Sequence, residues 1–187
     1  MLTVLLAMSL AAQSPAPPAA APDYSGLYEK GVPFARFLAD ATSLKAEWDA
    51  NFAAATIEDA SLTRAKALTG SWRILVVAED SCHDSLGTLP YLAKLVDASP
   101  DTLSMRVVRK AVGLPVMEAH RTPDGRPATP TIVVLDAGGK VKGVIAERPA
   151  ALWEFSKAHS ARDERRQWYA DDKGRHAISE ILDLIDK

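Results

Sequence analysis

The 187-residue sequence predicts a three-layer α/β fold, with a central mixed sheet and helices on both faces. Apolar strand patterns cover residues 72–78, 103–109, 131–135 and 141–146. A helical pattern over 82–97 separates the first two strands, which is typical of a parallel strand-helix-strand unit. The paired glycines Gly138 and Gly139 lie between the last two strands and favour an antiparallel hairpin. Parallel and antiparallel pairs together make the predicted sheet mixed.

Residues 1–22 are expected to lie outside the folded part. Residues 2–12 form an uncharged apolar run, and a stretch rich in proline and alanine follows at 14–22. The run is shorter than the roughly 20 residues of a membrane-spanning helix, so no integral membrane span is expected. It fits the apolar core of a cleaved secretory signal, although no Lys or Arg precedes Lys30. We therefore expect a periplasmic or secreted protein; a cytoplasmic protein with a disordered tail is the alternative.

Residues 23–70 are expected to form a helical extension ahead of the sheet. Apolar residues recur at helical spacing over 33–39 and over 44–53. A third helical pattern covers 60–68 and ends near Gly70, because glycine readily terminates helices. The extension is therefore predicted to hold three helices.

Residues 71–187 are expected to form the main domain and to end in helices. A short helix is expected near 114–120, between the second and third strands, and another over 149–159. A charged helix is expected from Ala161 onward. It becomes amphipathic through apolar residues at helical spacing, namely Ile178, Ile181, Leu182 and Ile185.

The composition indicates an ordinary globular chain. Hydrophobic residues make up 48% and charged residues 25%, which is enough apolar material for one compact core. A net charge of -2 gives no general attraction to nucleic acid or to anionic membranes, so neither is an expected partner. One cysteine and four histidines without ligand spacing predict no metal site and no cofactor. The histidines are His83, His120, His159 and His176.

Cys82 is the only cysteine, and it lies where the first strand pattern runs into the helical pattern. A sulfur at a helix N-terminus faces unpaired backbone N–H groups and the positive end of the helix dipole, which both favour the thiolate. A lone cysteine cannot form a disulfide within its own chain. It is therefore a free reactive thiol, a partner in an intermolecular disulfide, or an inert buried residue.

Besides the position of its cysteine, three features make the chain resemble the thioredoxin superfamily. Cys82 has the position of that family's reactive thiol, and Pro90 follows it at the offset where thioredoxins kink the active-site helix. The segment 128–131, which contains Pro130, resembles the cis-proline segment that faces the thiol. The glycine hairpin matches the family's closing hairpin. The resemblance implies a thioredoxin-like fold over residues 70–150.

A narrower resemblance is to a bacterial thioredoxin-like group whose motif reads Glu-Asp-Trp-Cys-Gly-Asp-Ser or similar. Residues 79–85 read Glu-Asp-Ser-Cys-His-Asp-Ser here, and the tail 168–175 also resembles that group. Ser81 replaces the usual tryptophan, and His83 replaces glycine. Ser85 stands where thioredoxins carry a resolving cysteine, so the motif is C-x-x-S. Dithiol chemistry within one chain is therefore excluded.

The motif suggests Cys82, Ser85 and His83 as catalytic residues. Cys82 would be the nucleophile toward a disulfide. Ser85 could hydrogen-bond the thiolate from one turn down the helix, or be a harmless replacement of a lost cysteine. His83 could add positive charge beside the sulfur and Asp84 negative charge, although adjacent helix positions diverge by about 100°. The preceding strand has Val76-Val77 where thioredoxins carry a buried acid, so the usual proton relay is expected to be absent.

Thr129, Pro130 and Arg126 are the expected substrate-binding residues. Thr129 and Pro130 would present backbone groups to an extended substrate strand, as in β-augmentation; a proline turn that only starts a strand is the alternative. Arg126, together with Arg121, could attract the carboxylates of glutathione, or could simply be solvated. The charged run 162–166 is interpreted as a solvated helix face.

The sequence therefore predicts monothiol thiol–disulfide exchange through Cys82, with a protein disulfide or a glutathione-type thiol as substrate. An external thiol would resolve the mixed disulfide. One alternative is a non-catalytic module that binds a protein partner in the same groove. Another is a redox sensor that forms an intermolecular disulfide through Cys82. An iron–sulfur cluster, as in monothiol glutaredoxins with their own C-x-x-S motif, would need a dimer and cytosolic glutathione, which the expected export argues against.

Overall fold

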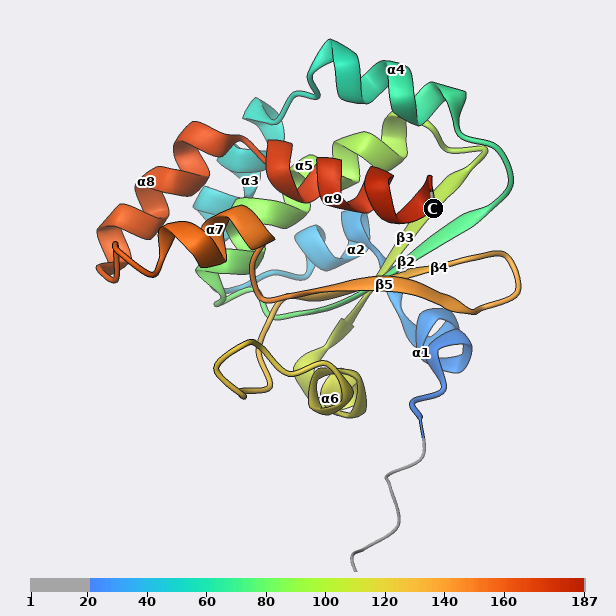
Figure 1. Ribbon diagram of the computed structural model, residues 1–187, viewed down its shortest axis with the longest axis horizontal. Coiled ribbons are helices and arrows are strands. Elements are labelled where there is room, and N and C mark those ends of the chain that lie inside the picture. The colour runs from blue at the N-terminus through green and yellow to red at the C-terminus, as the bar shows by residue number, and fades with distance from the viewer. Residues whose placement is uncertain (1–20, 187) are drawn as a thin grey trace, which may run out of the picture.

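The computed structural model describes residues 21–186, and these contain a five-stranded mixed sheet (Figure 1). The strands are β1 (Val32–Pro33), β2 (Trp72–Ala78), β3 (Leu103–Arg109), β4 (Thr131–Leu135) and β5 (Val141–Ala146). Their order across the sheet is β1-β3-β2-β4-β5. β2 and β3 run parallel, and every other neighbouring pair runs antiparallel. The predicted α/β fold with a mixed sheet is confirmed.

Helices cover both faces of this sheet. They are α1 (Tyr24–Lys30), α2 (Phe34–Ala39), α3 (Lys45–Ala54), α4 (Asp59–Ala67), α5 (His83–Ala98), α6 (Lys110–Ala119), α7 (Ala150–Phe155), α8 (Arg162–Asp172) and α9 (Arg175–Ile185). Figure 1 shows α1 and α6 below the sheet, with α5 and α9 among the helices above it. The signal-like segment proposed within residues 1–22 lies almost wholly outside the described residues. Within 21–186, no helix has the length and apolar character that crossing a bilayer requires.

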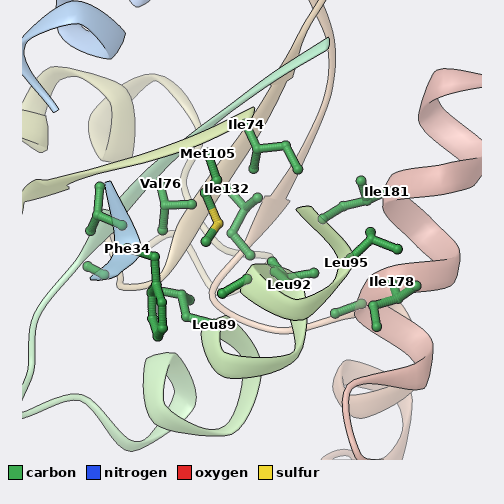
Figure 2. Close-up of a cluster of buried hydrophobic side chains, with 14 of the residues drawn as sticks. Phe34, Ile74, Val76, Leu89, Leu92, Leu95, Met105, Ile132, Ile178 and Ile181 are labelled. Atoms are coloured by element: carbon green, nitrogen blue, oxygen red, sulfur yellow. The ribbon is translucent and has the colours of Figure 1, made fainter. Parts of the chain in front are cut away.

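The two faces of the central strand build two separate clusters of buried side chains. Ile74 and Val76 of β2 point into the larger cluster, whereas Leu75 and Val77 point into the smaller one beneath α1 and α6. Alternate residues of a strand face opposite sides, so a strand buried on both faces is apolar throughout. Figure 2 shows strand residues of the larger cluster against three leucines of α5 and two isoleucines of α9, namely Leu89, Leu92, Leu95, Ile178 and Ile181.

The N-terminal extension is part of the larger cluster. Phe37 and Trp48 are almost fully buried and lie edge to face, with ring centroids 5.5 Å apart. α2, α3 and α4 all appear in this region, as the apolar spacing predicts. α1 and β1 were not predicted: α1 has only seven residues, capped by the Asp23 carboxylate, and β1 has only two. α1 buries two adjacent residues, Leu27 and Tyr28, and therefore lacks the apolar spacing that predicted α2.

Three helix boundaries after the sheet begins differ from the prediction. α6 starts at Lys110 rather than 114, because Glu79 accepts a hydrogen bond from the backbone N–H of Lys110 at 2.7 Å. α7 ends at Phe155 rather than 159. The single charged helix expected from Ala161 is wrong, since α8 and α9 are separate helices.

The break between α8 and α9 has a local cause. Lys173 and Gly174 both have left-handed backbone angles, with φ of 52° and 75°. A Cβ atom on Gly174 would lie 2.4 Å from Cβ of Tyr91, so glycine is required for this close approach to α5. The chain therefore turns over the side of α5, and α8 and α9 both pack against that helix.

Candidate functional site

The site is built where β2 ends and α5 begins. Cys82 is the N-cap residue of α5, with φ −90° and ψ 117°, and its side chain makes no capping hydrogen bond. Its carbonyl accepts the first helical bond from Leu86 N–H at 3.0 Å. The thiol is partly exposed and donates from Sγ to the carbonyl oxygen of Thr129 at 3.1 Å. The sulfur therefore lies at the end of a helix where unpaired N–H groups gather.

Thr129 belongs to the segment that leads into β4. The peptide bond between Thr129 and Pro130 is cis. The Pro130 carbonyl accepts from the Glu147 N–H at 2.7 Å, and the Thr131 hydroxyl donates to the carbonyl of Ala128, also at 2.7 Å. These bonds hold the segment against the end of β5. The structure thus brings Cys82, Thr129 and Pro130 into one small region.

Ser85 lies one turn after Cys82 and is fully buried. Positions three apart share a helix face, so Ser85 and Cys82 are on the same side of α5. Among the described residues, the Ser85 hydroxyl has no hydrogen-bond partner. A buried hydroxyl that keeps a free donor is uncommon and calls for a physical explanation.

Pro90 sits inside α5 and leaves one carbonyl without its helical partner. Proline has no N–H, so it cannot bond the carbonyl of Leu86, four residues before it. Asn51 of α3 supplies the missing donor, from Nδ2 to the Leu86 oxygen at 3.2 Å. The N-terminal extension therefore supplies the hydrogen bond that Pro90 removes from the motif helix.

His83 faces α8. Nη2 of Arg166 lies 2.7 Å from Nε2 of His83, and a guanidinium can only donate. Nε2 therefore accepts in this arrangement. Arg166 is exposed, as the interpretation of 162–166 as a solvated face expects, but it also contacts His83 of the motif.

Arg126 is tied to two acids near the cis-proline segment. It lies 2.8 Å from the Asp124 carboxylate and 3.1 Å from that of Glu147. Hydrogen bonds to Asp124 and then Glu147 raise the pKa of Arg126. Arg121 instead pairs with Glu118 and with the Gly125 carbonyl of the same loop. The two loop arginines therefore have different acidic partners.

The acids just before Cys82 form a network that sequence analysis missed. Asp80 accepts from the backbone N–H groups of Thr42 at 2.8 Å and Ser43 at 3.1 Å, and from Arg109 at 2.9 Å. Burial alone would raise the pKa of Asp80, but these donors outweigh it and lower the pKa to about 2. Glu79 lies 3.5 Å from the same guanidinium. The carboxylate of Asp80 is therefore fully partnered.

Trp48 anchors the same region from the N-terminal extension. Its side chain is completely buried, and Nε1 donates to the backbone carbonyl of Asp80 at 2.8 Å. Together with the Thr42 and Ser43 contacts, this bond clamps the extension onto the turn that carries Cys82. No local sequence signal predicts these contacts, since Trp48 and Asp80 are 32 residues apart.

Asp84 forms a second missed network on the other side of Cys82. Its buried carboxylate lies 3.0 Å from Nε of Arg165 in α8 and 3.8 Å from Nε of Arg148 after β5. Arg148 also lies 3.4 Å from Glu147. The first turn of α5, the end of β5 and α8 are therefore joined by one chain of charges. The interpretation of 162–166 as a solvated face is wrong for Arg165, which is largely buried against Asp84.

Tyr169 of α8 packs against the backbone of α5. A Cβ atom on Gly87 would lie 2.5 Å from Cγ of Tyr169, so this contact needs glycine. Burial, followed by the nearby charge of Asp84, raises the pKa of Tyr169 well above its usual value. Its hydroxyl and the Thr88 hydroxyl make no hydrogen bond that meets normal geometry among the described residues, and the Asp84 oxygen nearest Arg165 is held by the ion pair alone.

A family model for thioredoxin matches residues 31–163 of the sequence, which is most of the chain. The chain belongs to the thioredoxin family. The matched region begins within the N-terminal extension and reaches the start of α8. It therefore contains Cys82, the Asp80 network and the cis-proline segment with Thr129 and Pro130.

Solved structures support this thioredoxin fold. One is a protein of unknown function from Pseudomonas aeruginosa, with 23% identity and a TM-score of 0.71. Another is an HIV epitope scaffold, with 21% identity and a TM-score of 0.73. Each match covers 88% of this chain and 98% of the other. No curated protein gives a significant match.

The thioredoxin site in this chain contains a thiol and no grouped metal ligands. Within residues 21–186, no set of three or more His, Cys, Asp or Glu side chains is placed to hold a metal ion. The chemistry available at the site is therefore that of a single sulfur, neighbouring hydroxyls and two ion-pair networks.

Proposed function

We propose that this thioredoxin-family protein carries out monothiol thiol–disulfide exchange through Cys82. The observation that carries the proposal is the position of Sγ, at the N-terminus of α5 and 3.1 Å from the carbonyl of Thr129. A helix N-terminus stabilises a thiolate, and the partly exposed sulfur can be reached by a substrate. Thiol–disulfide exchange needs both conditions.

In the proposed reaction, the Cys82 thiolate attacks one sulfur of a substrate disulfide. A bond forms between Sγ and that sulfur, and the other half of the substrate leaves as a thiolate that takes a proton from water. The substrate strand lies along Thr129 and Pro130 through backbone hydrogen bonds. Ser85, one turn below, has a hydroxyl that is unpaired among the described residues and is free to donate to the thiolate when it forms. An external thiol then resolves the mixed disulfide.

His83 and Arg126 have supporting roles in this proposal. Arg126 gives positive charge beside the cis-proline segment, although Asp124 and Glu147 already engage it. It therefore orients an anionic group at the rim only weakly. His83 is engaged by Arg166, so it acts on the side of the motif that faces α8.

The test is the reduction of a protein disulfide by a small thiol, with the purified protein as catalyst. Cys82→Ser should abolish the catalysed rate, and a wild-type mixed disulfide should be trapped in mass spectra. Ser81→Ala is the matched control, because Ser81 is the exposed neighbour of Cys82. A Cys82→Ser variant that keeps the catalysed rate would refute the proposal.

A second candidate function is a binding module without catalysis. Val76 and Val77 are completely buried and apolar, so the strand before the motif offers no acid to move a proton. This candidate expects partner binding that survives Cys82→Ser but is lost when Thr129 or Arg126 is altered. A covalent dimer that forms with peroxide would instead favour a redox sensor.

We also propose that the protein acts outside the cytoplasm, in the periplasm or as a secreted protein. The apolar run at 2–12, followed by the proline- and alanine-rich stretch, supports this location. Expression of the full chain followed by fractionation and N-terminal sequencing tests it. Cleavage near the end of the apolar run is expected, and an intact cytoplasmic chain would contradict it.

A further inference from the structure

A groove runs along α5 beside Cys82, between α3 and α8. It encloses about 370 Å³ and is lined by Glu47, Asn51, His83, Leu86, Gly87, Tyr91, Arg166, Tyr169 and Ala170. The three helices lie together at the left of Figure 1. Small-molecule sites typically begin at about 300 Å³, so the groove can hold a compact ligand.

The groove has an apolar floor. Leu86 and the ring of Tyr169 line it, and the bare backbone of Gly87 lies between them. A ligand carbon chain or sulfur atom would therefore meet apolar surface rather than charge. This suits the uncharged middle of a small molecule whose polar groups are at its ends.

The rim carries opposite charges on opposite walls. Glu47 of α3 is exposed, and among the described residues no cation lies within ion-pair distance of it. Arg166 of α8 is half exposed and contacts only His83 and, at 3.7 Å, Asp163. A guanidinium has five N–H donors, so several stay free to bind a carboxylate. The two walls together suit a molecule with one ammonium and one carboxylate group.

The groove lies next to the proposed nucleophile. His83 lines it and directly follows Cys82 in the chain. Leu86 also lines it and donates the first helical hydrogen bond of α5 to the Cys82 carbonyl, so it lies one turn after Cys82. Thr129 contacts the sulfur from the cis-proline segment, which contributes no residue to the groove. Cys82 does not line the groove itself, so a molecule bound there would approach the motif at its His83 end, without occupying Thr129 and Pro130.

We propose that this groove binds the thiol that resolves the mixed disulfide: a small zwitterionic thiol of the cysteine or cysteinyl-peptide class. The proposal rests on the proposed exchange activity of Cys82. Arg166 binds the carboxylate of the thiol, Glu47 binds its ammonium group, and the Leu86 and Tyr169 surface receives the carbon chain. The substrate disulfide and the resolving thiol then approach Cys82 from different sides.

The electrons balance over two such thiols. The thiolate of the first attacks Sγ of the mixed disulfide, forms a new S–S bond with Cys82, and releases the second half of the substrate as a thiolate. The thiolate of a second molecule attacks the sulfur of the first, forms a small disulfide, and releases the Cys82 thiolate. Protons pass from the two thiols through water to the two substrate sulfurs. One substrate disulfide is reduced, and two thiols are oxidised.

The test starts from purified protein whose Cys82 carries a mixed disulfide with the uncharged 2-thiopyridine. Release of thiopyridine is followed with cysteine, glutathione or neutral 2-mercaptoethanol, at equal thiolate concentrations. The wild type should favour the zwitterionic thiols by about tenfold, because each exposed ion pair is weak and two act together. Glu47→Gln and Arg166→Gln should each lower that ratio toward one. Arg162→Gln is the matched control, since this α8 residue does not line the groove.

A second readout does not depend on the reaction. The Cys82→Ser variant is titrated with S-methylcysteine and observed by NMR, and shifts are expected in α3 and α8 around Glu47 and Arg166. A wild-type ratio near one, or a preference that both Gln variants keep, would overturn the groove assignment. If folded wild-type protein forms no mixed disulfide at all while S-methylcysteine still binds, the proposed exchange activity fails and the groove remains a binding site of another purpose.

Discussion

The two sides of the Cys82 turn differ in how completely their polar groups are partnered. On the side before the cysteine, Asp80 accepts hydrogen bonds from Thr42, Ser43 and Arg109. On the side after it, Asp84 and Arg148 have ion pairs, but several buried polar atoms make no hydrogen bond. Six buried side-chain atoms are without a hydrogen bond in the described part of the chain, and all but that of Ser99 belong to this second side. The others are in Asp84, Ser85, Thr88, Arg148 and Tyr169.

This difference indicates that the two sides of the thiol have different roles, one in stability and the other in function. A saturated buried network fixes its surroundings, whereas each unpartnered buried group costs about 1–3 kcal/mol. The side that holds Asp80 and Trp48 therefore acts as the rigid anchor of the motif. On the side that faces α8, the buried polar atoms without hydrogen bonds reduce the stability of the fold. The groove beside His83 lies on this side. We expect stability to respond mainly to the first side and thiol selectivity to the second.

The largest effect is expected at Trp48 on the anchoring side. Trp48→Ala should lower the free energy of unfolding by about 3–5 kcal/mol, because a fully buried indole and its bond to the Asp80 carbonyl are lost. Urea denaturation measures this change. Trp72→Ala is the control: this indole is only half buried and bonds the nearby Thr69 carbonyl, so its loss should be smaller. Equal losses of unfolding free energy in Trp48→Ala and Trp72→Ala would contradict the anchoring role of the side before Cys82.

Asp80→Asn should cost about 2 kcal/mol near neutral pH. The folded pKa of about 2 lies below the ordinary 3.8, so the charged carboxylate stabilises the fold at all pH values above that range. This stabilisation disappears as the pH falls from 3.8 toward 2. Unfolding of wild type and variant should therefore converge in acid, as urea titrations at pH 6 and near pH 2.5 would show. Asp101→Asn, at an exposed position, should leave the pH dependence unchanged.

Gly87→Ala should cost about 1–2 kcal/mol, because the new methyl group meets the ring of Tyr169. The exposed α8 can shift outward and relieve part of the clash. A double-mutant cycle with Tyr169→Ala measures this coupling, and the double variant should lose less stability than the sum of the two single changes. Strict additivity would mean that α8 does not depend on this contact.

Tyr169→Phe should change stability by less than about 1 kcal/mol, because its hydroxyl makes no hydrogen bond of normal geometry among the described residues. Tyr24→Phe is the matched comparison, since the Tyr24 hydroxyl bonds His120 at 2.7 Å. Thermal unfolding of both variants sharpens the contrast between partnered and unpartnered groups. If Tyr169→Phe lowers the melting temperature more than Tyr24→Phe does, the Tyr169 hydroxyl has a hydrogen bond after all, and the contrast between the two sides fails.

Much of the fold could be predicted from the sequence because it follows from periodicity. The four long strands and the start of α5 at the Cys82 turn follow from apolar runs and from the change from strand to helix spacing. The split between α8 and α9 could not be predicted by the same means. It depends on left-handed angles at Lys173 and Gly174 and on the nearby Tyr91, which is distant in sequence.

The candidate site shows the same limit. The position of Cys82 at a helix start can be predicted from the local pattern alone. The partners of Asp80 and Asp84 cannot, because Thr42, Arg148 and Arg165 come from three separate parts of the chain. Arg165 lies in a charged run that has the usual pattern of a solvated helix face. Only the packing of α8 onto α5 shows that one side of that run is in contact with the motif.

The central claim, that the fold makes Cys82 reactive, is tested most directly by its rate of reaction with a small neutral disulfide at pH 6. The reference is a synthetic peptide of residues 76–88, which has the same neighbours without the fold. The account predicts that folded protein reacts faster than the peptide by about tenfold, because helix N-termini stabilise thiolates. A folded protein that reacts no faster than the peptide, or only after unfolding in urea, would contradict it.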